Sequence, residues 1–249
     1  MGTKVIGGIL GANRARQYYR SSNPTRYDYS TASNIIDLST GTVSFWVFVP
    51  TVADNYNTYN DIFSIYNPTL SSEFTIGLVR SGGRRSIRKY TVNLTSYNQA
   101  MIELFTTDFN SNANTWFHVA VSKGGICALN GASGSTFNDG WFTHVASDVS
   151  NPKLLKFGQT DDSTRYPGRN TNLGKHIRVA KPFILNTSIS ASDMAGIYNA
   201  GITFDPRKSK WADNLVSFWP MEDNGAGLND IVGPNNLTAS PTSGNYVNF

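Results

Sequence analysis

Glutamate, cysteine and long apolar runs are scarce in this sequence of 249 residues. Glu occurs three times, at Glu73, Glu103 and Glu222, and charged residues make up 15% of the chain, against about 25% in an average soluble protein. Coiled coils and helical bundles need Glu, Lys, Leu and Ala in quantity, so this composition excludes them. The longest apolar run, residues 45–49, is far shorter than the ~18 residues of a membrane-spanning helix. No membrane insertion is therefore expected.

Cysteine chemistry and secretion are also not expected. Cys127 is the only cysteine, so the chain has no internal disulfide framework, and its apolar neighbours predict an inert strand position. The apolar stretch near the N-terminus is short and interrupted by glycines, which is too short for the apolar region of a signal peptide. We therefore expect a protein that is made in a cytoplasm.

Short apolar and β-branched runs recur along the chain, separated by clusters of Gly, Asn, Pro and Ser. Well over a third of the residues are Asn, Ser, Thr or Gly, and aromatic residues reach 12%. This pattern is typical of an all-β sandwich. The predicted strands cover residues 42–49, 61–66, 74–79, 86–94, 101–106, 116–122, 126–129, 154–157 and 177–185, with shorter ones at 216–220 and 246–249.

Glycine-rich segments predict the turns between several of these strands. Residues 81–84 (SGGR), 123–125 (KGG) and 130–131 (NG) each separate two strand-like runs. Gly and Asn tolerate the positive φ that tight hairpin turns require. We therefore predict three hairpins at these positions.

One helix is well specified, close to residues 191–200. Ser190 is placed to cap its first turn, and Asp193 occupies the third helical position, as in a capping box. Ile189 and Met194 are spaced for a hydrophobic staple. Gly201 stands where a helix ends in a left-handed conformation.

The positive charge is concentrated in two groups. One lies near the N-terminus, and the other is a tight cluster of Arg80, Arg84, Arg85, Arg88 and Lys89. Such clusters can hold nucleic acid or an acidic partner surface. The simpler interpretation of the second cluster is a solvated hairpin tip, and nucleic acid is not expected as a partner.

Five segments, in this order and spacing, resemble the laminin G-like, concanavalin A-like lectin and glucanase jelly roll. They are Ile36–Val47, Asn114–Val121, Cys127–Gly131, Leu155–Gly158 and Ile177–Gly201. The resemblance implies an all-β fold, a jelly-roll sandwich of two antiparallel sheets with one short helix near residues 191–200. It also implies three regions: a basic N-terminal arm (1–33), the lectin-like jelly roll (34–205) and a C-terminal segment (206–249) that packs on or completes the sandwich.

The C-terminal segment resembles a further element of these proteins. Leu215–Asp223, followed by Asp230–Leu237, is similar to an element that precedes the jelly roll in many relatives. Here it follows the jelly roll, and this order resembles laminin G-like proteins of bacteriophage particles. The resemblance implies a virion protein that is made in the host cytoplasm.

The sequence lacks the catalytic groups that enzymes of this fold use. Their glucanases carry two carboxylates in an E-x-D-x-x-E strand, whereas the three Glu residues here are 30 and 119 positions apart. No Gly-x-Ser-x-Gly elbow is present, and none of the three histidines has a partner at a metal-ligand spacing. His118 lies in a strand pattern that predicts a packed or hydrogen-bonded position. We therefore expect no enzyme activity.

Calcium is the one ion that the pattern leaves open, and no other cofactor is expected. Lectin-like sandwiches often bind calcium with loop carboxylates and carbonyls. Candidate carboxylates are Asp54 and Asp61, or Asp161 and Asp162. No EF-hand spacing is present, and residues 174–176 (GKH) replace the G-x-I-D-E pattern that is frequent in the family, so no ligand set carries over.

Two functions are consistent with these observations. The first is a non-enzymatic structural protein of a bacteriophage particle, an oligomeric decoration or accessory protein of the capsid or tail. Its basic arm would contact other virion proteins through Lys4, Arg14, Arg16 and Arg20. The alternative is a receptor-binding, lectin-like module that recognises host surface glycans. Sugar faces stack on aromatic rings while polar neighbours bind hydroxyls, and the candidate aromatic residues are Tyr56, Tyr59, Tyr66, Trp141 and Tyr166.

Overall fold

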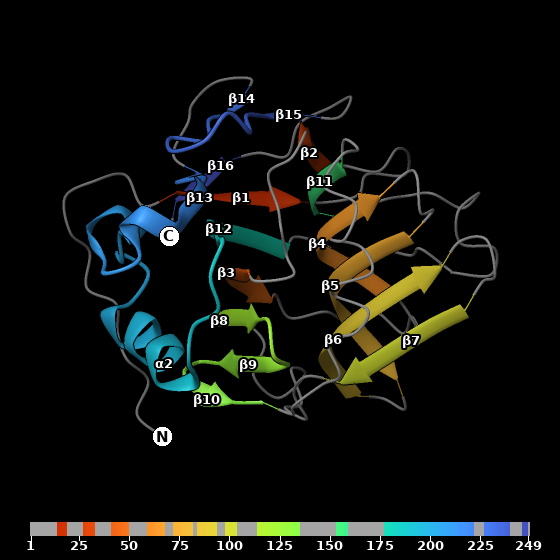
Figure 1. The fold of residues 1–249 in the computed structure, drawn as a ribbon. Coiled ribbons are helices and arrows are strands. Elements are labelled where there is room, and N and C mark those ends of the chain that lie inside the picture. The colour runs from red at the N-terminus through yellow and green to blue at the C-terminus, as the bar shows by residue number, and fades with distance from the viewer. Residues whose placement is uncertain are drawn as a thin grey trace.

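Two antiparallel sheets face each other, and a helix lies outside one of them (Figure 1). This computed structural model describes residues 14–18, 27–32, 41–49, 59–67, 72–81, 84–93, 98–103, 114–134, 153–158, 177–221, 227–239 and 246–248. The prediction of an all-β sandwich with one short helix is confirmed. Among the described residues no helix is long and apolar enough to span a membrane.

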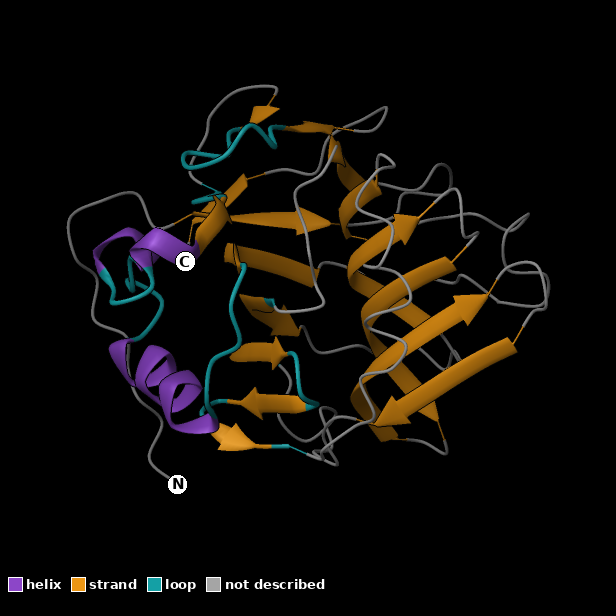
Figure 2. Ribbon diagram, in the orientation of Figure 1, coloured by secondary structure: helices purple, strands orange, loops and turns teal. Residues whose placement is uncertain are grey.

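Sheet A is the sheet that the helix covers (Figure 2). Its strands, in spatial order, are β10 (Ala132–Ser133), β9 (Ile126–Leu129), β8 (Thr115–Ser122), β3 (Thr42–Val49), β12 (Ile177–Leu185), β1 (Arg14–Tyr18) and β16 (Tyr246–Asn248). A further strand, β13 (Leu215–Phe218), also pairs with β12. Six of these eight strands were predicted within two residues at both ends, namely β3, β8, β9, β12, β13 and β16.

Sheet B contains the long hairpins of the first half of the chain. Its strands, in spatial order, are β14 (Gly227–Leu228), β15 (Leu237–Ala239), β2 (Tyr27–Ala32), β11 (Lys153–Gly158), β4 (Tyr59–Asn67), β5 (Ser72–Ser81), β6 (Arg84–Asn93) and β7 (Asn98–Glu103). The two sheets therefore draw their strands from both ends of the sequence.

Both flanking regions of the predicted jelly roll contribute strands to the sheets. Within residues 1–33, predicted as an arm, β1 pairs with β12 and β2 pairs with β11. Within residues 206–249, β16 pairs with β1 and β15 pairs with β2. The described parts of these regions are thus hydrogen-bonded into the sandwich on both sides, and Arg14 and Arg16 lie in strand β1.

The predicted hairpin turns agree with the strand registers. Ser81 pairs with Arg84 across a two-residue connection between β5 and β6. Leu129 pairs with Ala132 across Asn130 and Gly131, whose φ angles are 50° and 76°. Positive φ at both central residues is the conformation that follows the right-handed twist of paired strands.

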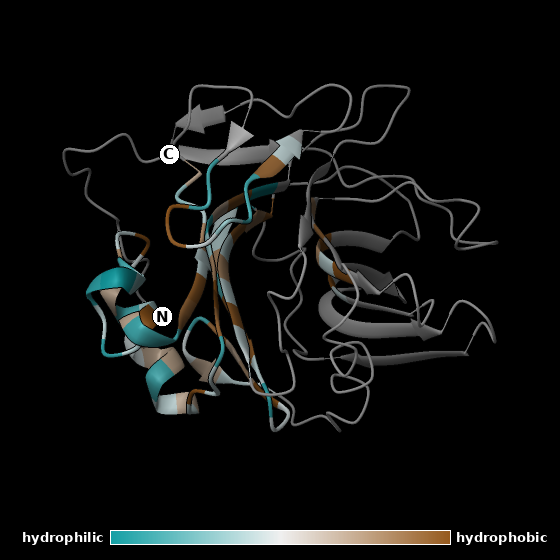
Figure 3. Ribbon diagram, turned by 45° about the horizontal axis from the view of Figure 1, so that its top comes forward, coloured by the Kyte–Doolittle hydropathy of each residue, from teal (hydrophilic) through white to brown (hydrophobic). Residues whose placement is uncertain are grey.

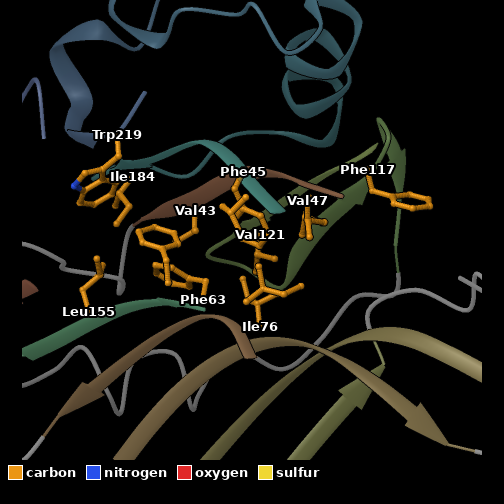
Figure 4. Packing of buried hydrophobic residues seen from close by; sticks show 14 of the residues in the cluster. Val43, Phe45, Val47, Phe63, Ile76, Phe117, Val121, Leu155, Ile184 and Trp219 are labelled. Carbon is orange, nitrogen blue, oxygen red and sulfur yellow. The ribbon is translucent and has the colours of Figure 1, made fainter. Parts of the chain in front are cut away.

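The main core lies between the inner faces of the two sheets (Figure 4). From sheet A, alternate residues of β3 and β8 point into it; from sheet B, Phe63, Ile76 and Leu155 meet them. The phenyl rings of Phe45 and Phe63 lie 6.4 Å apart, and Trp219 packs edge-on against Phe157 at 5.3 Å. Burial of this apolar surface is the main driving force for the assembly of the sandwich.

The outer face of sheet A is buried as well, because helix α2 (Ala191–Ala200) and the segments around it cover it. The side of α2 that faces solvent is hydrophilic, as the view in Figure 3 shows. Two short 3₁₀ helices, η1 (Pro206–Lys208) and η2 (Ala212–Asn214), follow α2. The covering cluster contains Ile189, Met194 and Ile197 from the helical side, packed on Phe183 and Leu185 of β12.

The local signals predicted for α2 are all present. Ser190 Oγ accepts a hydrogen bond from Asp193 N at 3.2 Å, and Ser190 N donates to Asp193 Oδ2 at 3.3 Å, which completes the capping box. Ile189 and Met194 are both buried in one cluster, as a hydrophobic staple requires. Gly201 ends the helix with a φ of 81°. Asp193 also forms an ion pair of 2.7 Å with Lys210, which ties the helix to the following segment.

A buried carboxylate organises the loop between β14 and β15. Asp230 Oδ1 accepts hydrogen bonds from the backbone N–H groups of Phe218, Val232 and Gly233 at 3.0–3.1 Å. Its Oδ2 accepts from the N–H of Asn235 at 3.2 Å. The carboxylate thereby joins the loop to strand β13, which explains why the D-x-x-G pattern of this segment needs its aspartate.

Gly233, the glycine of this pattern, is required because there is no room for a side chain at this position. A Cβ atom at Gly233 would contact the carbonyl oxygen of Val216 and lie 2.8 Å from Asp230 Oδ2. We therefore expect Gly233→Ala to lower the free energy of unfolding by about 1–3 kcal/mol, because backbone atoms must move apart. The matched control is Gly196→Ala, since a Cβ at this helical position has no atom within 4 Å. It should raise stability by about 0.5–1 kcal/mol, and urea unfolding of both variants measures the difference.

Candidate functional site

The strand registers place several tyrosine positions on the outer face of sheet B, the face turned away from sheet A. In β4 and β5 the inner positions are marked by the core residues Phe63 and Ile76, which are register partners. Paired residues of antiparallel strands lie on the same face, and successive residues alternate between faces. Ser64 and its partner Thr75 therefore belong to the outer face.

A transverse row of positions runs across five strands through this pair. In spatial order from β2 to β6 it contains Tyr29, Lys156, Ser64, Thr75 and Tyr90. Neighbouring strands are about 4.8 Å apart, so the row spans about 19 Å. It places aromatic positions at its two ends and polar positions between them.

Two further tyrosines of the same face come from β4 itself. A register shift between Asp61 and Phe63 makes Ile62 an extra residue, a β-bulge. Because of this bulge, Tyr59 and Asp61 lie on the same face as Ser64 and Tyr66, although Tyr59 and Tyr66 are seven residues apart. The predicted carbohydrate-binding residues Tyr59 and Tyr66 are thus brought to one face of sheet B.

The two hydroxyl groups at the centre of this face have unused hydrogen-bonding capacity. Ser64 and Thr75 are fully buried, and within the described part of the chain neither hydroxyl has a hydrogen-bond partner. Buried side-chain hydroxyls without a partner are uncommon in folded proteins. Because neither residue is exposed to solvent, these hydroxyls lie below the surface and do not themselves face a ligand.

The other predicted site residues are distributed differently. Tyr56, Trp141 and Tyr166 lie outside the described residues, and so do Lys4 and Arg20. Tyr29, Tyr90 and Lys156 were not predicted, since none stands in an aromatic loop. Strand alternation in residues 27–31 and 88–92 contains the relevant signal, but it can be interpreted only when the partner strands are known.

A second polar group, on the opposite sheet, is enclosed by packing. Ser44 Oγ and His118 Nε2 are 2.8 Å apart on the outer face of sheet A, and both residues are fully buried. The imidazole ring lies 5.2 Å from the ring of Trp46 and 6.4 Å from that of Tyr198. Its Nδ1 has no hydrogen-bond partner among the described residues. The predicted hydrogen-bonded position of His118 is confirmed, and a serine–histidine pair without access to solvent serves packing.

Burial also determines the protonation of two groups. Desolvation lowers the pKa of His118 to about 3, so its imidazole is neutral at pH 7. Burial raises the pKa of the Cys127 thiol to about 11, which makes it a poor nucleophile and confirms the predicted inert position. No group of three His, Cys, Asp or Glu residues that could hold a metal ion occurs in the described ranges. Of the calcium candidates, Asp61 lies in β4, and the calcium site stays a prediction.

The burial of His118 predicts a loss of stability in acid. Its pKa is 6.5 in the unfolded chain and about 3 in the folded protein, so the unfolded state binds the proton more tightly. The contribution is fully present above pH 6.5 and is lost as the pH falls towards 3. We expect urea unfolding to show a decrease of about 3 kcal/mol from this residue between pH 7 and pH 4. His118→Gln should show a flatter pH dependence, and an unchanged dependence would contradict the assignment.

Comparison with known proteins identifies the fold class of this chain, but no family and no function. No family model matches the chain, and no curated protein matches it. Solved structures do: a protein from Bacteroides ovatus, to which carbohydrate binding has been assigned provisionally, superposes with a TM-score of 0.55 at 14% identity. That alignment covers 96% of this chain and 61% of the other, so this chain spans about three fifths of its length.

A second similar structure is the heptameric SAP-like pentraxin of Limulus polyphemus. It has a TM-score of 0.53 at 12% identity, and the alignment covers 86% of this chain and 95% of the pentraxin. Both are lectin-like jelly rolls, and with the two antiparallel sheets they confirm the predicted fold class. At these identities the similarity concerns the fold alone.

Proposed function

We propose that this protein is a non-enzymatic, carbohydrate-binding jelly-roll module, and that the outer face of sheet B is its binding face. The observation that carries the proposal is the register that brings the positions of Tyr59 and Tyr66 to one face of sheet B. Aromatic rings offer apolar faces to sugar rings, and polar groups beside them exchange hydrogen bonds with sugar hydroxyls. The provisional assignment of carbohydrate binding to the Bacteroides ovatus protein is in agreement.

The opposite face of the sandwich is less suited to a ligand. On the outer face of sheet A, the positions around Ser44 and His118 are covered by α2 and its neighbours. Their polar groups are largely used within the protein, as in the 2.8 Å contact between Thr42 Oγ1 and Ser122 Oγ. The absence of an E-x-D-x-x-E strand from the sequence argues for binding without hydrolysis.

Loss of one tyrosine should distinguish the two faces. Tyr66→Ala on sheet B should weaken binding to glycans on an array by about tenfold, which corresponds to ~1.4 kcal/mol of lost stacking. The matched control is Phe48→Ala, because Phe48 is a partly exposed aromatic residue on the outer face of sheet A. Its affinity for glycans should stay within twofold of the original. Equal losses in both variants, or an array without any bound glycan, would overturn the proposal.

A second, more specific proposal concerns the biological particle to which this module belongs. We further propose that it is a structural or accessory protein of a bacteriophage capsid or tail, where glycan binding would attach the particle to its host. The support is the sequence order, in which Leu215–Asp223 and Asp230–Leu237 follow the jelly roll as they do in laminin G-like proteins of phage particles. This assignment includes homo-oligomers and contacts with other virion proteins.

Composition of purified particles tests this second proposal. The protein should be found by mass spectrometry in particles banded on a density gradient, in a fixed number of copies relative to the major capsid protein. Electron microscopy should show density that is missing from particles made without the gene. Particles that contain none of the protein would contradict the virion role and leave the carbohydrate-binding proposal intact.

A further inference from the structure

Most edge strands of the two sheets are short or covered. β10, β14 and β16, which end three of the strand rows, have two or three residues each. The edge of β13 is covered by the loop between β14 and β15, because Phe218 N donates to Asp230 Oδ1 and Ile231 N donates to the carbonyl oxygen of Phe218. Short and covered edges are common means by which proteins prevent their sheets from pairing with other chains.

Strand β7 is the exception among these edges. It is the outermost strand of sheet B, beyond β6 (Figure 1), and has six residues, Asn98–Glu103. Among the described strands, none pairs with its other edge. Its register with β6 contains no bulge, and its sequence, NQAMIE, contains no proline and no lysine, so the other devices that block strand addition are missing from it as well. This edge therefore offers a row of backbone N–H and C=O groups to a further strand.

The sequence of β7 is self-complementary in polarity. If two copies pair antiparallel with Met101 opposite Met101, then Gln99 stands opposite Glu103 and Ala100 opposite Ile102. Every pair then joins two polar or two apolar residues, which is the favourable arrangement across paired strands. If Ala100 or Ile102 is opposite itself instead, Met101 meets Gln99 or Glu103. The register centred on Met101 is thus the one that matches polarity.

We propose that β7 forms the interface of a two-fold symmetric homodimer, in which β7 of a second copy extends sheet B in antiparallel orientation with Met101 at the symmetry axis. In such an isologous interface the same surface is used by both copies, which a self-complementary strand permits. Main-chain hydrogen bonds supply the affinity of strand addition, and the residues at alternate positions specify the register. The interface itself does not depend on the proposed function.

This symmetry would place the two candidate binding faces on the same side of one continuous sheet. Met101 is the register partner of Tyr90, so its position continues the transverse row of sheet B that contains Thr75. With strands about 4.8 Å apart, the Thr75 positions of the two copies would be about 24 Å apart. Two faces at this spacing can bind one long glycan at two places, which raises the avidity. Only this consequence rests on the proposed function.

Two lysine variants test the interface by sedimentation velocity of the full chain, from about 1 to 100 μM at low salt. Met101→Lys places like charges directly opposite each other, whereas Gln99→Lys places the same charge on the same strand and face but opposite Glu103 of the second copy. We expect Met101→Lys to raise the dissociation constant of the dimer at least tenfold, and Gln99→Lys to lower it at least twofold. Circular dichroism and the Tm establish that each variant is folded.

Two results of this experiment would overturn the inference. One is an unmodified chain that stays monomeric over the whole concentration range. The other is a pair of lysine variants that change the dissociation constant in the same direction, because general charge repulsion would then explain both. Dimers that behave as expected but bind no glycan would support the interface and contradict only the proposed function.

Oxidative cross-linking tests the register independently. Met101→Cys puts two thiols at directly opposed positions, whereas the two thiols of Gln99→Cys would be four residues, about 14 Å, apart along the strands, too far for a disulfide. The native Cys127 is buried, so the unmodified chain is the blank. After oxidation with copper phenanthroline, a non-reducing gel should show more than half of Met101→Cys as dimer and no more dimer for Gln99→Cys than for the blank. Equal cross-linking of the two variants, or none in either, would contradict the register.

Discussion

Sheet A is buried on both faces, and this constraint determines much of the rest of the structure. Its inner face meets sheet B in the main core, and its outer face is covered by α2 and the segments around it. Nearly every residue of β3 is therefore buried, including Thr42 and Ser44. Buried polar groups must find partners inside the protein, and these two find Ser122 and His118.

The same constraint gives the two sheets different roles. The hydroxyl of Ser122 both contacts Thr42 and accepts a hydrogen bond from Ile189 N at 3.1 Å, which holds the residues before α2 against the sheet. Sheet A is thus the internal scaffold of the molecule. Its outer face is occupied by the protein's own helix, and the tyrosine positions of the candidate site belong to sheet B. The candidate site follows from which sheet the helix covers.

Elements with local signals could be predicted from the sequence, and elements that depend on distant partners could not. The continuous apolar run of β3 and the capping residues of α2 are signals within the element itself. Both elements were predicted with their observed bounds. Strand β1, with the sequence RARQY, has no apolar alternation. It is a strand because it pairs with β12 on one side and β16 on the other, which no local pattern indicates.

The candidate site shows the same limit more sharply. Tyr59 and Tyr66 were predicted as carbohydrate-binding residues, but among aromatic loops and without a common surface. Seven residues apart on a regular strand, they would lie on opposite faces, and only the bulge at Ile62 brings them to one face. A bulge is an extra residue in one strand relative to its partner, so it cannot be inferred from the sequence of β4 alone.

Pairing between the two ends of the chain has a consequence for the order of folding. β16 completes sheet A against β1, and β15 pairs with β2 in sheet B, so contacts more than two hundred residues apart in the sequence close both sheets. During synthesis, these partners of β1 and β2 leave the ribosome only after nearly the whole chain has been made. Topologies dominated by such distant contacts fold slowly, and the growing chain exposes unpaired strand edges for most of that time. We therefore expect the pairing of β16 with β1 and of β15 with β2 to be the last step in completing the two sheets.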